Sequence, residues 1–413
     1  GYNTIHVMAL TKPVANGGAL YEGMDGALLY YRSQDGGVNW DKTHVQPTGT
    51  DSAYYTGFSG DGYAFAASRG NTIAFVVGDN WYDLFLLKST DNGDTWSKTV
   101  IFQHPYPKFN EATTLVLDTP WVCDGGVAVA LDENGMAHVA FGLMRVLNAD
   151  LTDGNTSYFP FTDGIGYWKE TDGTLNNINI DTLDAAGRVI GWWQDLNDND
   201  TIDIIGGSSE SIGLYFLSAS SMPQLAVEGT DSVYLVYSSI TENKDNGIQN
   251  YRHLWARASF DGGDNWGDFV YLSESILHNY DECVFPSIAS KVDNNLYVLY
   301  QADEEPGLHV RGDEDAATDN TMIFMTVSKG EFGVGINEPV QYLGQVSQNY
   351  PNPANGQTSI LVNLVSSSDL SLEVTNLMGQ QVMAMSHGKV GAGMHSFDLN
   401  VSGLSEGVYF YTV

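Results

Sequence analysis

One stretch of the chain combines residue types and a spacing that suit a calcium ion. Between Asp195 and Asp203, oxygen-bearing residues recur at every second position: Asp195, Asn197, Asn199, Thr201 and Asp203. Calcium takes carboxylate, amide and carbonyl oxygens, and Thr201 could serve through its backbone carbonyl. The sixth position of this loop is aspartate instead of the usual glycine, and the twelfth is glycine instead of the usual glutamate. A bidentate carboxylate must therefore come from elsewhere. We expect Ca²⁺ as a cofactor here; the alternative is an acidic turn without metal.

Other signals for catalysis are weak. The chain has no nucleophile elbow, phosphate-binding loop, HExxH or CxxC motif. Acidic residues are numerous enough to supply the paired carboxylates of a glycosidase, but spacing in sequence does not show which two meet in space. Arg311-Gly-Asp313 is interpreted as a chance tripeptide in an acidic loop. Four scattered histidines are interpreted as surface or core residues: His104, His253, His278 and His309. No catalytic residue can be named.

The two cysteines, Cys123 and Cys283, lie in similar local contexts, each a few residues before an apolar, strand-like run. They could form one disulfide, and the alternative is two buried free thiols.

The charge balance limits the partners. The chain has 51 acidic and 17 basic residues among 413, which gives a formal net charge of −34. Nucleic acid and anionic membrane surfaces would repel such a chain, so both are excluded as partners. No run of 18 apolar residues is present, so no membrane span is expected. Hydrophobic residues make up 43% of the chain, enough for a sizeable core.

An octapeptide of the form S-x-D-x-G-x-[TN]-W occurs three times. Its fixed residues are Ser33, Asp35, Gly37 and Trp40; Ser89, Asp91, Gly93 and Trp96; and Ser259, Asp261, Gly263 and Trp266. Each copy follows an apolar, strand-like run, so it predicts a hairpin turn. The glycine would adopt positive φ, the aspartate would accept hydrogen bonds from turn amides, and the tryptophan would pack on a neighbouring sheet. We interpret these residues as structural, because a single catalytic site would not need three copies.

A second repeat precedes the hairpins, in which an apolar strand, a polar turn and another apolar strand follow one another. It covers residues 64–77, 127–141, 224–237 and 287–300. Two paired strands followed by a hairpin make a four-stranded propeller blade. Hairpins fall near Asp35, Asp91, Asp172, Asp261 and Lys329, the third and the fifth as decayed copies. The first blade begins with what matches the second strand of the others, so five blades are predicted, or six if upstream sequence exists.

The octapeptides resemble the Asp boxes (BNR repeats) of sialidase-like β-propellers. That resemblance implies the fold, while sialidase activity would also require an Arg-Ile-Pro motif and three arginines that clamp the substrate carboxylate. The motif is absent, and few arginines are available: Arg32, Arg69, Arg145, Arg188, Arg252, Arg257 and Arg311. Arg32 and Arg257 lie next to octapeptides and look structural. Sialidase activity is therefore not expected.

A different module begins near residue 345. It opens with Asn349-Tyr-Pro-Asn-Pro353, continues with Val374-Thr-Asn-Leu-Met-Gly-Gln380 and ends with Gly407-Val-Tyr-Phe-Tyr411. Alternating strands and glycine turns predict a small antiparallel sandwich. The segment resembles the type A C-terminal sorting domain of proteins secreted by the type IX (Por) system of Bacteroidetes. This implies export across the outer membrane, with residues 345–413 contacting the secretion machinery, and a secreted or cell-surface location.

The expected architecture is all-β: a five- or six-bladed propeller over residues 1–340, with an insertion at about 144–220, followed by a small Ig-like antiparallel β-sandwich over residues 345–413. The expected function is non-catalytic binding of glycans or proteins at the cell surface, or self-assembly outside the cell. The alternative is a secreted glycoside hydrolase or lyase that acts on polysaccharide from one face of the propeller.

Overall fold

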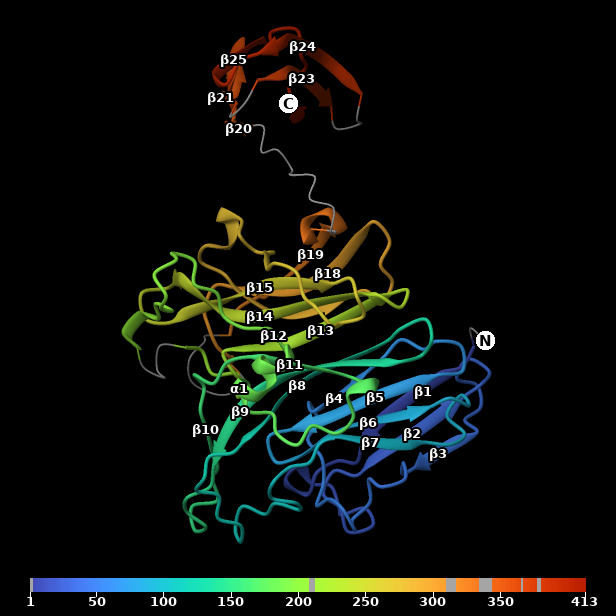
Figure 1. Ribbon diagram of the computed structural model, residues 1–413. Helices are drawn as coiled ribbons and strands as arrows, with labels where there is room; N and C mark the ends of the chain where they lie inside the picture. Colours follow the sequence, from blue (N-terminus) through green and yellow to red (C-terminus); the bar gives the residue numbers. More distant parts are fainter. Residues whose placement is uncertain (1–2, 208–211, 310–316, 334–343, 365–366, 377–379) are drawn as a thin grey trace. The chain divides into compact units, whose positions relative to one another are not determined.

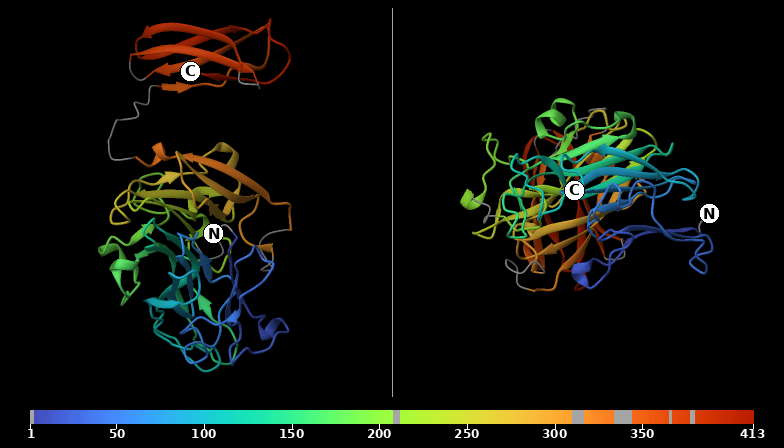
Figure 2. Two further views of the ribbon diagram at one scale, coloured as in Figure 1. Left: turned by 90° about the vertical axis from the view of Figure 1, so that its right-hand side faces the viewer. Right: turned by 90° about the horizontal axis from the view of Figure 1, so that it is seen from below.

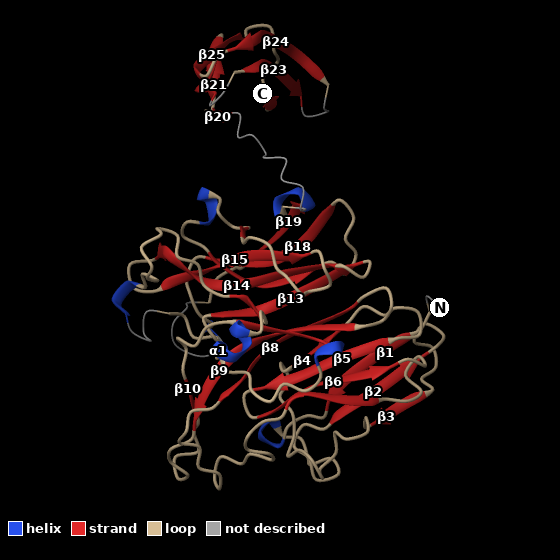
Figure 3. Ribbon diagram, in the orientation of Figure 1, coloured by secondary structure: helices blue, strands red, loops and turns tan. Residues whose placement is uncertain are grey.

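The computed structural model describes residues 3–207, 212–309, 317–333, 344–364, 367–376 and 380–413. The chain forms two compact units, Gly1–Val334 and Gly335–Val413. Regular structure is almost entirely strand (Figure 3). The described helical segments are short: α1 (Ile180–Ala185) and 3-10 turns at Val14–Asn16, Glu170–Asp172, Ile205–Gly207, Ile276–His278 and Lys329–Phe332. No helix in the described ranges is long and apolar enough to cross a membrane.

The described part of the first unit contains five antiparallel sheets (Figure 1). The first sheet contains β1 (Ile5–Leu10), β2 (Leu28–Ser33) and β3 (Lys42–Val45). The second contains β4 (Tyr63–Phe65), β5 (Ile73–Asp79), β6 (Tyr82–Ser89) and β7 (Ser97–Phe102). The third contains β8 (Trp121–Leu131), β9 (Ala137–Leu147), β11 (Ile165–Lys169) and β12 (Val189–Gly191), with β10 (Ser157–Tyr158) also paired to β9. The fourth contains β13 (Ser220–Glu228), β14 (Ser232–Asp245), β15 (Asn250–Ser259) and β16 (Val270–Tyr271). The fifth contains β17 (Glu282–Ile288), β18 (Asn295–Asp303) and β19 (Thr321–Ser328).

Consecutive sheets pack face to face, which explains why the strands are apolar at almost every position. Successive side chains of a strand point to opposite faces of its sheet. In β5, Phe75 and Val77 enter the core shared with the first sheet. Ala74 and Val76 enter the core shared with the third. Equivalent cores join the third sheet to the fourth and the fourth to the fifth.

The innermost strands of the second to fifth sheets converge on a central cavity of about 110 Å³. Its lining is mostly small or apolar, from Ala64 on β4, Val129 on β8, Ala226 on β13 and Ile288 on β17. The sheets succeed one another in chain order around this centre (Figure 2). The result is the propeller-like, all-β arrangement that the repeats predict. The described strands of the first sheet, β1 to β3, contribute no residue to the cavity lining.

The two ends of the sheets differ. The octapeptides and the turns that join the innermost strand to the second strand lie at one end. There Arg69, in the β4–β5 turn, donates hydrogen bonds to the carbonyls of Leu131 (3.0 Å) and Val227 (3.2 Å), at the ends of β8 and β13. The long connections lie at the other end, called here the loop end. The predicted insertion at 144–220 proves to contain β10, β11, α1 and β12, so part of it completes the third sheet.

The second unit consists of two antiparallel sheets with one shared core. One sheet contains β20 (Gly344–Val346), β21 (Tyr350–Asn355), β22 (Gln357–Leu364) and β25 (Gly393–Asn400), and the other contains β23 (Ser368–Asn376), β24 (Gln381–Val390) and β26 (Tyr409–Thr412). Alternate residues of β22 and β23, such as Ile360, Val362, Leu370 and Leu372, fill the core between them. β24 starts at Gln381, and residues 377–379 lie outside the described residues.

Candidate functional site

Each octapeptide forms a turn closed by its serine and aspartate. In the second copy, Gly93 N–H donates to Ser89 Oγ (2.8 Å) and Thr95 N–H donates to Asp91 Oδ1 (2.9 Å). Thr95 Oγ1 also donates to Asp91 Oδ2 (2.6 Å). The first and third copies repeat the pattern through Ser33, Asp35, Gly37 and Asn39, and through Ser259, Asp261, Gly263 and Asn265. All four bonding groups come from within eight residues, so the turn is specified locally.

These hydrogen bonds favour the ionised aspartates. The hydroxyl of Thr95 and then its amide hold the pKa of Asp91 well below its usual range. The amide of Asn39 does the same for Asp35. These aspartates therefore act as hydrogen-bond acceptors in the turn, and their lowered pKa makes them weak bases.

The second octapeptide also docks on the sheet before it. A Cβ on Gly93 would lie 1.9 Å from Tyr30 Oη, so only glycine fits there. The Trp96 ring packs edge-on against Tyr30, with centroids 4.9 Å apart. Arg32 donates to the carbonyl of Asn92 (2.6 Å) and to Asp94 (2.9 Å). The turn thus fastens the second sheet to the first.

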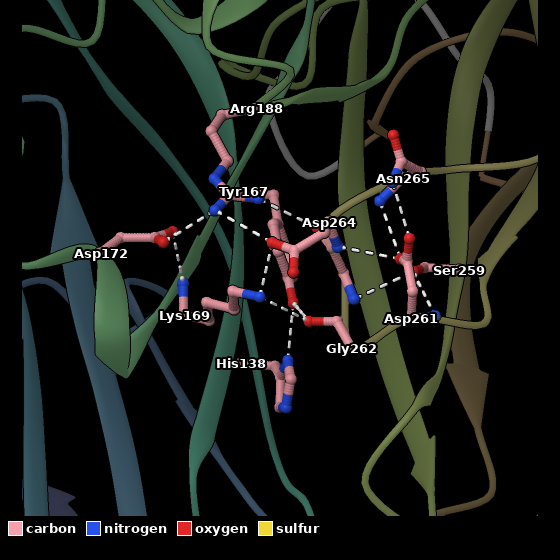
Figure 4. Close-up of polar contacts among 11 residues, drawn as sticks. His138, Tyr167, Lys169, Asp172, Arg188, Ser259, Asp261, Gly262, Asp264 and Asn265 are labelled. Atoms are coloured by element: carbon pink, nitrogen blue, oxygen red, sulfur yellow. Dashed lines mark hydrogen bonds and ion pairs between the residues drawn. The ribbon is translucent and has the colours of Figure 1, made fainter.

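The third octapeptide repeats this docking on the third sheet (Figure 4). A Cβ on Gly263 would lie 1.9 Å from Tyr167 Oη, and Trp266 packs against the same ring. Lys169 Nζ donates to Asp264 (2.6 Å) and to the carbonyl of Gly262 (3.2 Å). A glycine, an aromatic pair and an ion pair therefore recur at two sheet junctions. This arrangement supports an architectural role for the octapeptides.

Three of the innermost strands carry the same irregularity at the loop end. Register shifts interrupt β8, β13 and β17 near their starts, and Gly125, Met222 and Phe285 there have positive φ. A bulge of this kind bends the strand and re-aims its side chains. It turns acidic and hydroxyl side chains toward the space between the sheets.

These side chains form a buried polar network. Asp124 accepts hydrogen bonds from Ser218 Oγ (2.9 Å) and Ser218 N–H (3.1 Å). Arg252 donates to the carbonyls of Ser218 and Ala219, both at 2.9 Å. Glu282 accepts the backbone N–H of Arg252. The segment Ser218–Ala219 therefore connects the third, fourth and fifth sheets through polar groups.

The network contains carboxyl groups with raised pKa. Burial raises the pKa of Glu282 to about 8 against the opposing effect of Arg252. Burial likewise raises the pKa of Asp163 to about 6. Glu282 Oε1, Asp163 Oδ1 and Ser221 Oγ have no hydrogen-bond partner among the described residues. Groups with such pKa values suit proton transfer, but Glu282 and Asp124 are 0% and 3% exposed.

Aromatic side chains also gather at the loop end, where Phe216 lies two residues before Ser218 of the network. Trp81 stacks on Phe109 with ring centroids 3.8 Å apart, and Tyr158 lies 5.4 Å from Phe216. Trp81 and Tyr158 both pack on the small apolar cluster of Val122, Met144 and Val146, which joins the two pairs. Arg145 lies over the rings of Trp121 (6.0 Å) and Phe159 (5.5 Å). We call Trp81, Phe109, Trp121, Tyr158, Phe159 and Phe216 the aromatic surface. No repeat or motif marks these residues in the sequence.

The predicted calcium loop lies against a carboxylate that sequence spacing did not reveal. Glu242 on β14 is 0% exposed, yet its carboxylate accepts from Leu196 N–H (2.6 Å) and Asn197 Nδ2 (2.7 Å). Asp203 accepts from the amides of Asn197 and Asn199, both at 3.0 Å. Asp195 accepts three backbone N–H groups of the loop, and Asn199 accepts from Thr201. Glu242 is therefore a buried carboxylate in direct contact with this loop. In the described residues the two asparagine amides bridge the carboxylates, and no group of three acidic, His or Cys side chains is arranged around a metal position.

Cys123 and Cys283 occupy equivalent bulges in β8 and β17, as their similar contexts suggested, but they belong to different sheets. Both are buried and free, so they match the alternative of two free thiols. Burial raises the pKa of both thiols, which makes them poor nucleophiles.

The arginines and histidines named from the sequence do not come together at one site. Arg32, Arg69, Arg145, Arg188 and Arg252 act at the separate places described above, and Arg188 pairs with Asp172 (2.7 Å). Arg257 donates to the carbonyl of Gly267 and lies over Trp192. His104 and His253 are buried and bonded to groups of their own blades. Arg311-Gly-Asp313 lies outside the described residues.

One family model matches part of the chain. Residues 348–413 match the Secretion system C-terminal sorting domain family. The second unit is therefore a type IX sorting domain, and the protein is secreted to the cell surface or the extracellular space. No curated protein sequence matches the chain.

Solved structures of glycan-active enzymes are similar to the chain in fold. Polysaccharide lyase Uly1 is 10% identical over 96% of this chain and 75% of its own, with a TM-score of 0.38. A PL25 ulvan lyase with bound oligosaccharide is 10% identical over 87% and 73%, with a TM-score of 0.37. The GH43 endo-arabinanase of Bacillus licheniformis is 10% identical over 80% and 93%, with a TM-score of 0.32. At these values their activities do not transfer to the chain.

Proposed function

We propose that the secreted protein is a non-catalytic binding protein with a five- or six-bladed propeller, and that it holds a neutral glycan on the aromatic surface. The observation that carries the proposal is the set of aromatic rings at the loop end, with Phe159 37% and Phe216 43% exposed. Aromatic faces offer a flat apolar platform to the C–H groups of a sugar ring, and Arg145 beside them can donate to its hydroxyls. The sorting domain supplies contact with the secretion machinery.

The net charge narrows the glycan class. A chain with a formal charge of −34 repels sulfated and uronic-acid polymers at moderate ionic strength. The central cavity is lined mainly by apolar side chains, which suits packing better than chemistry on a sugar. A neutral polysaccharide is therefore the best match to this surface. A protein ligand would use the same rings and is the main competing outcome.

A glycan array on the purified protein tests the proposal. We expect binding to a neutral polysaccharide, with at least about fivefold weaker affinity in Phe159→Ala and Phe216→Ala, because a stacking aromatic contributes roughly 1 to 2 kcal/mol. Tyr280→Ala is the matched control, since this ring is 72% exposed and lies outside the aromatic surface. Equal losses in all three variants, or no binding to any neutral glycan, would refute the assignment.

A glycoside hydrolase or lyase is the second candidate, favoured by the raised pKa values of the buried carboxyl groups of Asp163 and Glu282. A carboxyl group protonated at neutral pH can act as a general acid. Release of reducing ends or unsaturated sugars, abolished by Glu282→Gln, would establish this candidate.

We also propose that the loop Asp195–Asp203 binds Ca²⁺ together with Glu242. Rotation of the Asn197 and Asn199 amides by 180° would turn carbonyl oxygens toward the space between Asp195, Asp203 and Glu242. Calcium should raise the unfolding temperature of the native protein and lose that effect in Asp203→Asn. Asp150→Asn, in another exposed acidic turn, should behave like the native protein. An equal calcium response in Asp203→Asn and the native protein would contradict this site.

A further inference from the structure

The first octapeptide differs from the other two in what covers it. Trp96 and Trp266 pack against tyrosines of the preceding sheet, and their indole nitrogens are buried. Trp40, the same residue of the first octapeptide, is 41% exposed, and Val38 beside it is 78% exposed. The backbone turn is the same in all three copies. The first octapeptide therefore forms the same turn, but within the described residues of the first unit its tryptophan stays exposed.

The residue that directly follows the conserved glycine also differs in the first octapeptide. Asp94 and Asp264 stand at this position in the second and third octapeptides, and both pair with a basic residue of the preceding sheet. In the first octapeptide the position is Val38. Ile5 lies beside it, 38% exposed and within 3.5 Å of where a Cβ on Gly37 would be. The surface formed by Ile5, Val38 and Trp40 is thus apolar where the others are charged.

The fifth sheet, at the other end of the series, also has an exposed apolar face. In β18 and β19, one set of alternate residues packs on the fourth sheet, including Val298, Tyr300 and Val327. The other set points away: Leu299 is 42% exposed, Met322 59% and Phe324 65%. Phe324 is paired in register with Leu299 and stacks on Tyr297. An exposed apolar face of this kind marks a contact surface.

We propose that the Ile5–Val38–Trp40 surface of one molecule docks on the Leu299–Met322–Phe324 face of a second copy of this chain. Both surfaces are exposed in the described residues of the first unit. The docking reuses the geometry of the two internal junctions, in which an octapeptide tryptophan meets aromatic side chains of the preceding sheet. The ion pair of those junctions is replaced by apolar contact on both sides. Two different patches meet, so the contact is head to tail and each copy can bind two others. This inference is independent of the proposed glycan binding, because it uses none of the aromatic surface.

The net charge sets the conditions of the association. Two chains of formal charge −34 repel each other at low salt, while apolar contact is little affected by ions. The association should therefore strengthen between about 0.05 M and about 0.5 M salt, the reverse of what ion-pair docking predicts.

Cysteine cross-linking in the full chain tests the proposal and distinguishes a second copy from closure within one chain. Val38→Cys and Phe324→Cys are prepared as separate proteins and mixed under mild oxidation; the native thiols are buried. We expect a disulfide-linked pair only in the mixture, and a ladder of linked chains in the double variant. Leu277→Cys, an exposed position on a different loop, replaces either partner as the control and should give no pair above background.

Two results would overturn the proposal. The first is a double variant that forms an internal disulfide and stays monomeric, which would show that the two faces meet within one chain. The second is a native protein that sediments as a monomer at all accessible concentrations in high salt. Val38→Asp should weaken the association at least about tenfold by placing an unpaired charge in the contact.

Discussion

Replacing Glu282 with glutamine should change the pH dependence of stability in a way that no surface substitution does. Glu282 is 0% exposed, and burial raises the pKa of its carboxyl group from 4.5 to about 8. Below pH 4.5 the group is protonated in both the folded and the unfolded chain and contributes no pH dependence. Between pH 4.5 and 8 the unfolded chain releases the proton and the folded protein keeps it. Ionisation therefore favours unfolding, and stability falls as pH rises through this window.

The size of the effect follows from the two pKa values. Each pKa difference of one corresponds to 1.36 kcal/mol, so the native protein should lose on the order of 3 to 4 kcal/mol between pH 5 and pH 8 through this group alone. Glutamine keeps an oxygen that can accept the Arg252 N–H but has no proton to lose. Glu282→Gln should therefore gain about that much stability relative to the native protein as pH rises from 5 to 8.

Urea unfolding followed by tryptophan fluorescence isolates the relevant unit, because all nine tryptophans lie before residue 334. Unfolding free energies would be measured at several pH values for the native protein, Glu282→Gln and Glu111→Gln, whose side chain is exposed. The Glu111→Gln curve should run parallel to the native one. A constant difference between Glu282→Gln and the native protein across pH 5 to 8 would refute the assignment of a raised pKa to Glu282.

Two further predictions concern the octapeptides. Gly93→Ala should destabilise the protein by at least about 3 kcal/mol, because the new Cβ meets Tyr30 Oη as well as the strain of positive φ. Gly37→Ala, which has the strain of positive φ without the clash, should cost about 1 to 2 kcal/mol. Equal losses of stability in the two variants, measured by thermal unfolding, would contradict the docking contact of Gly93 with Tyr30. Asp91→Asn should lower the unfolding temperature at pH 7 but have progressively less effect as pH falls below 4, because the stability contributed by a carboxylate with lowered pKa is lost as it becomes protonated. A destabilisation by Asp91→Asn that persists unchanged in acid would show that the carboxylate charge is irrelevant to the turn.

The sequence predicts well those features that depend on neighbouring residues. The octapeptide turns are closed by groups at most a few positions apart, so their spacing is visible as a motif. The paired strands of the repeats are visible for a similar reason, because each pair is joined by a short turn. The succession of sheets along the chain follows from comparing the copies.

Features built by distant residues are not visible in the same way. Glu242 meets a loop more than forty residues away in sequence. The buried network joins Asp124, Ser218, Arg252 and Glu282 from three sheets, and no spacing rule connects them. The hairpin predicted near Asp172 follows β11, but β12 lies beyond α1 within the predicted insertion, where no repeat marks it. Spatial proximity in these cases depends on how whole sheets pack.

The most direct test of the proposed function is to incubate the purified protein with the glycans that it binds and to analyse the products over time. The account predicts saturable binding to a neutral glycan that is weakened by Phe216→Ala, with reducing ends and unsaturated sugars remaining at the level of a protein-free control. Product release by the native protein that disappears in Glu282→Gln would contradict it and would establish an enzyme.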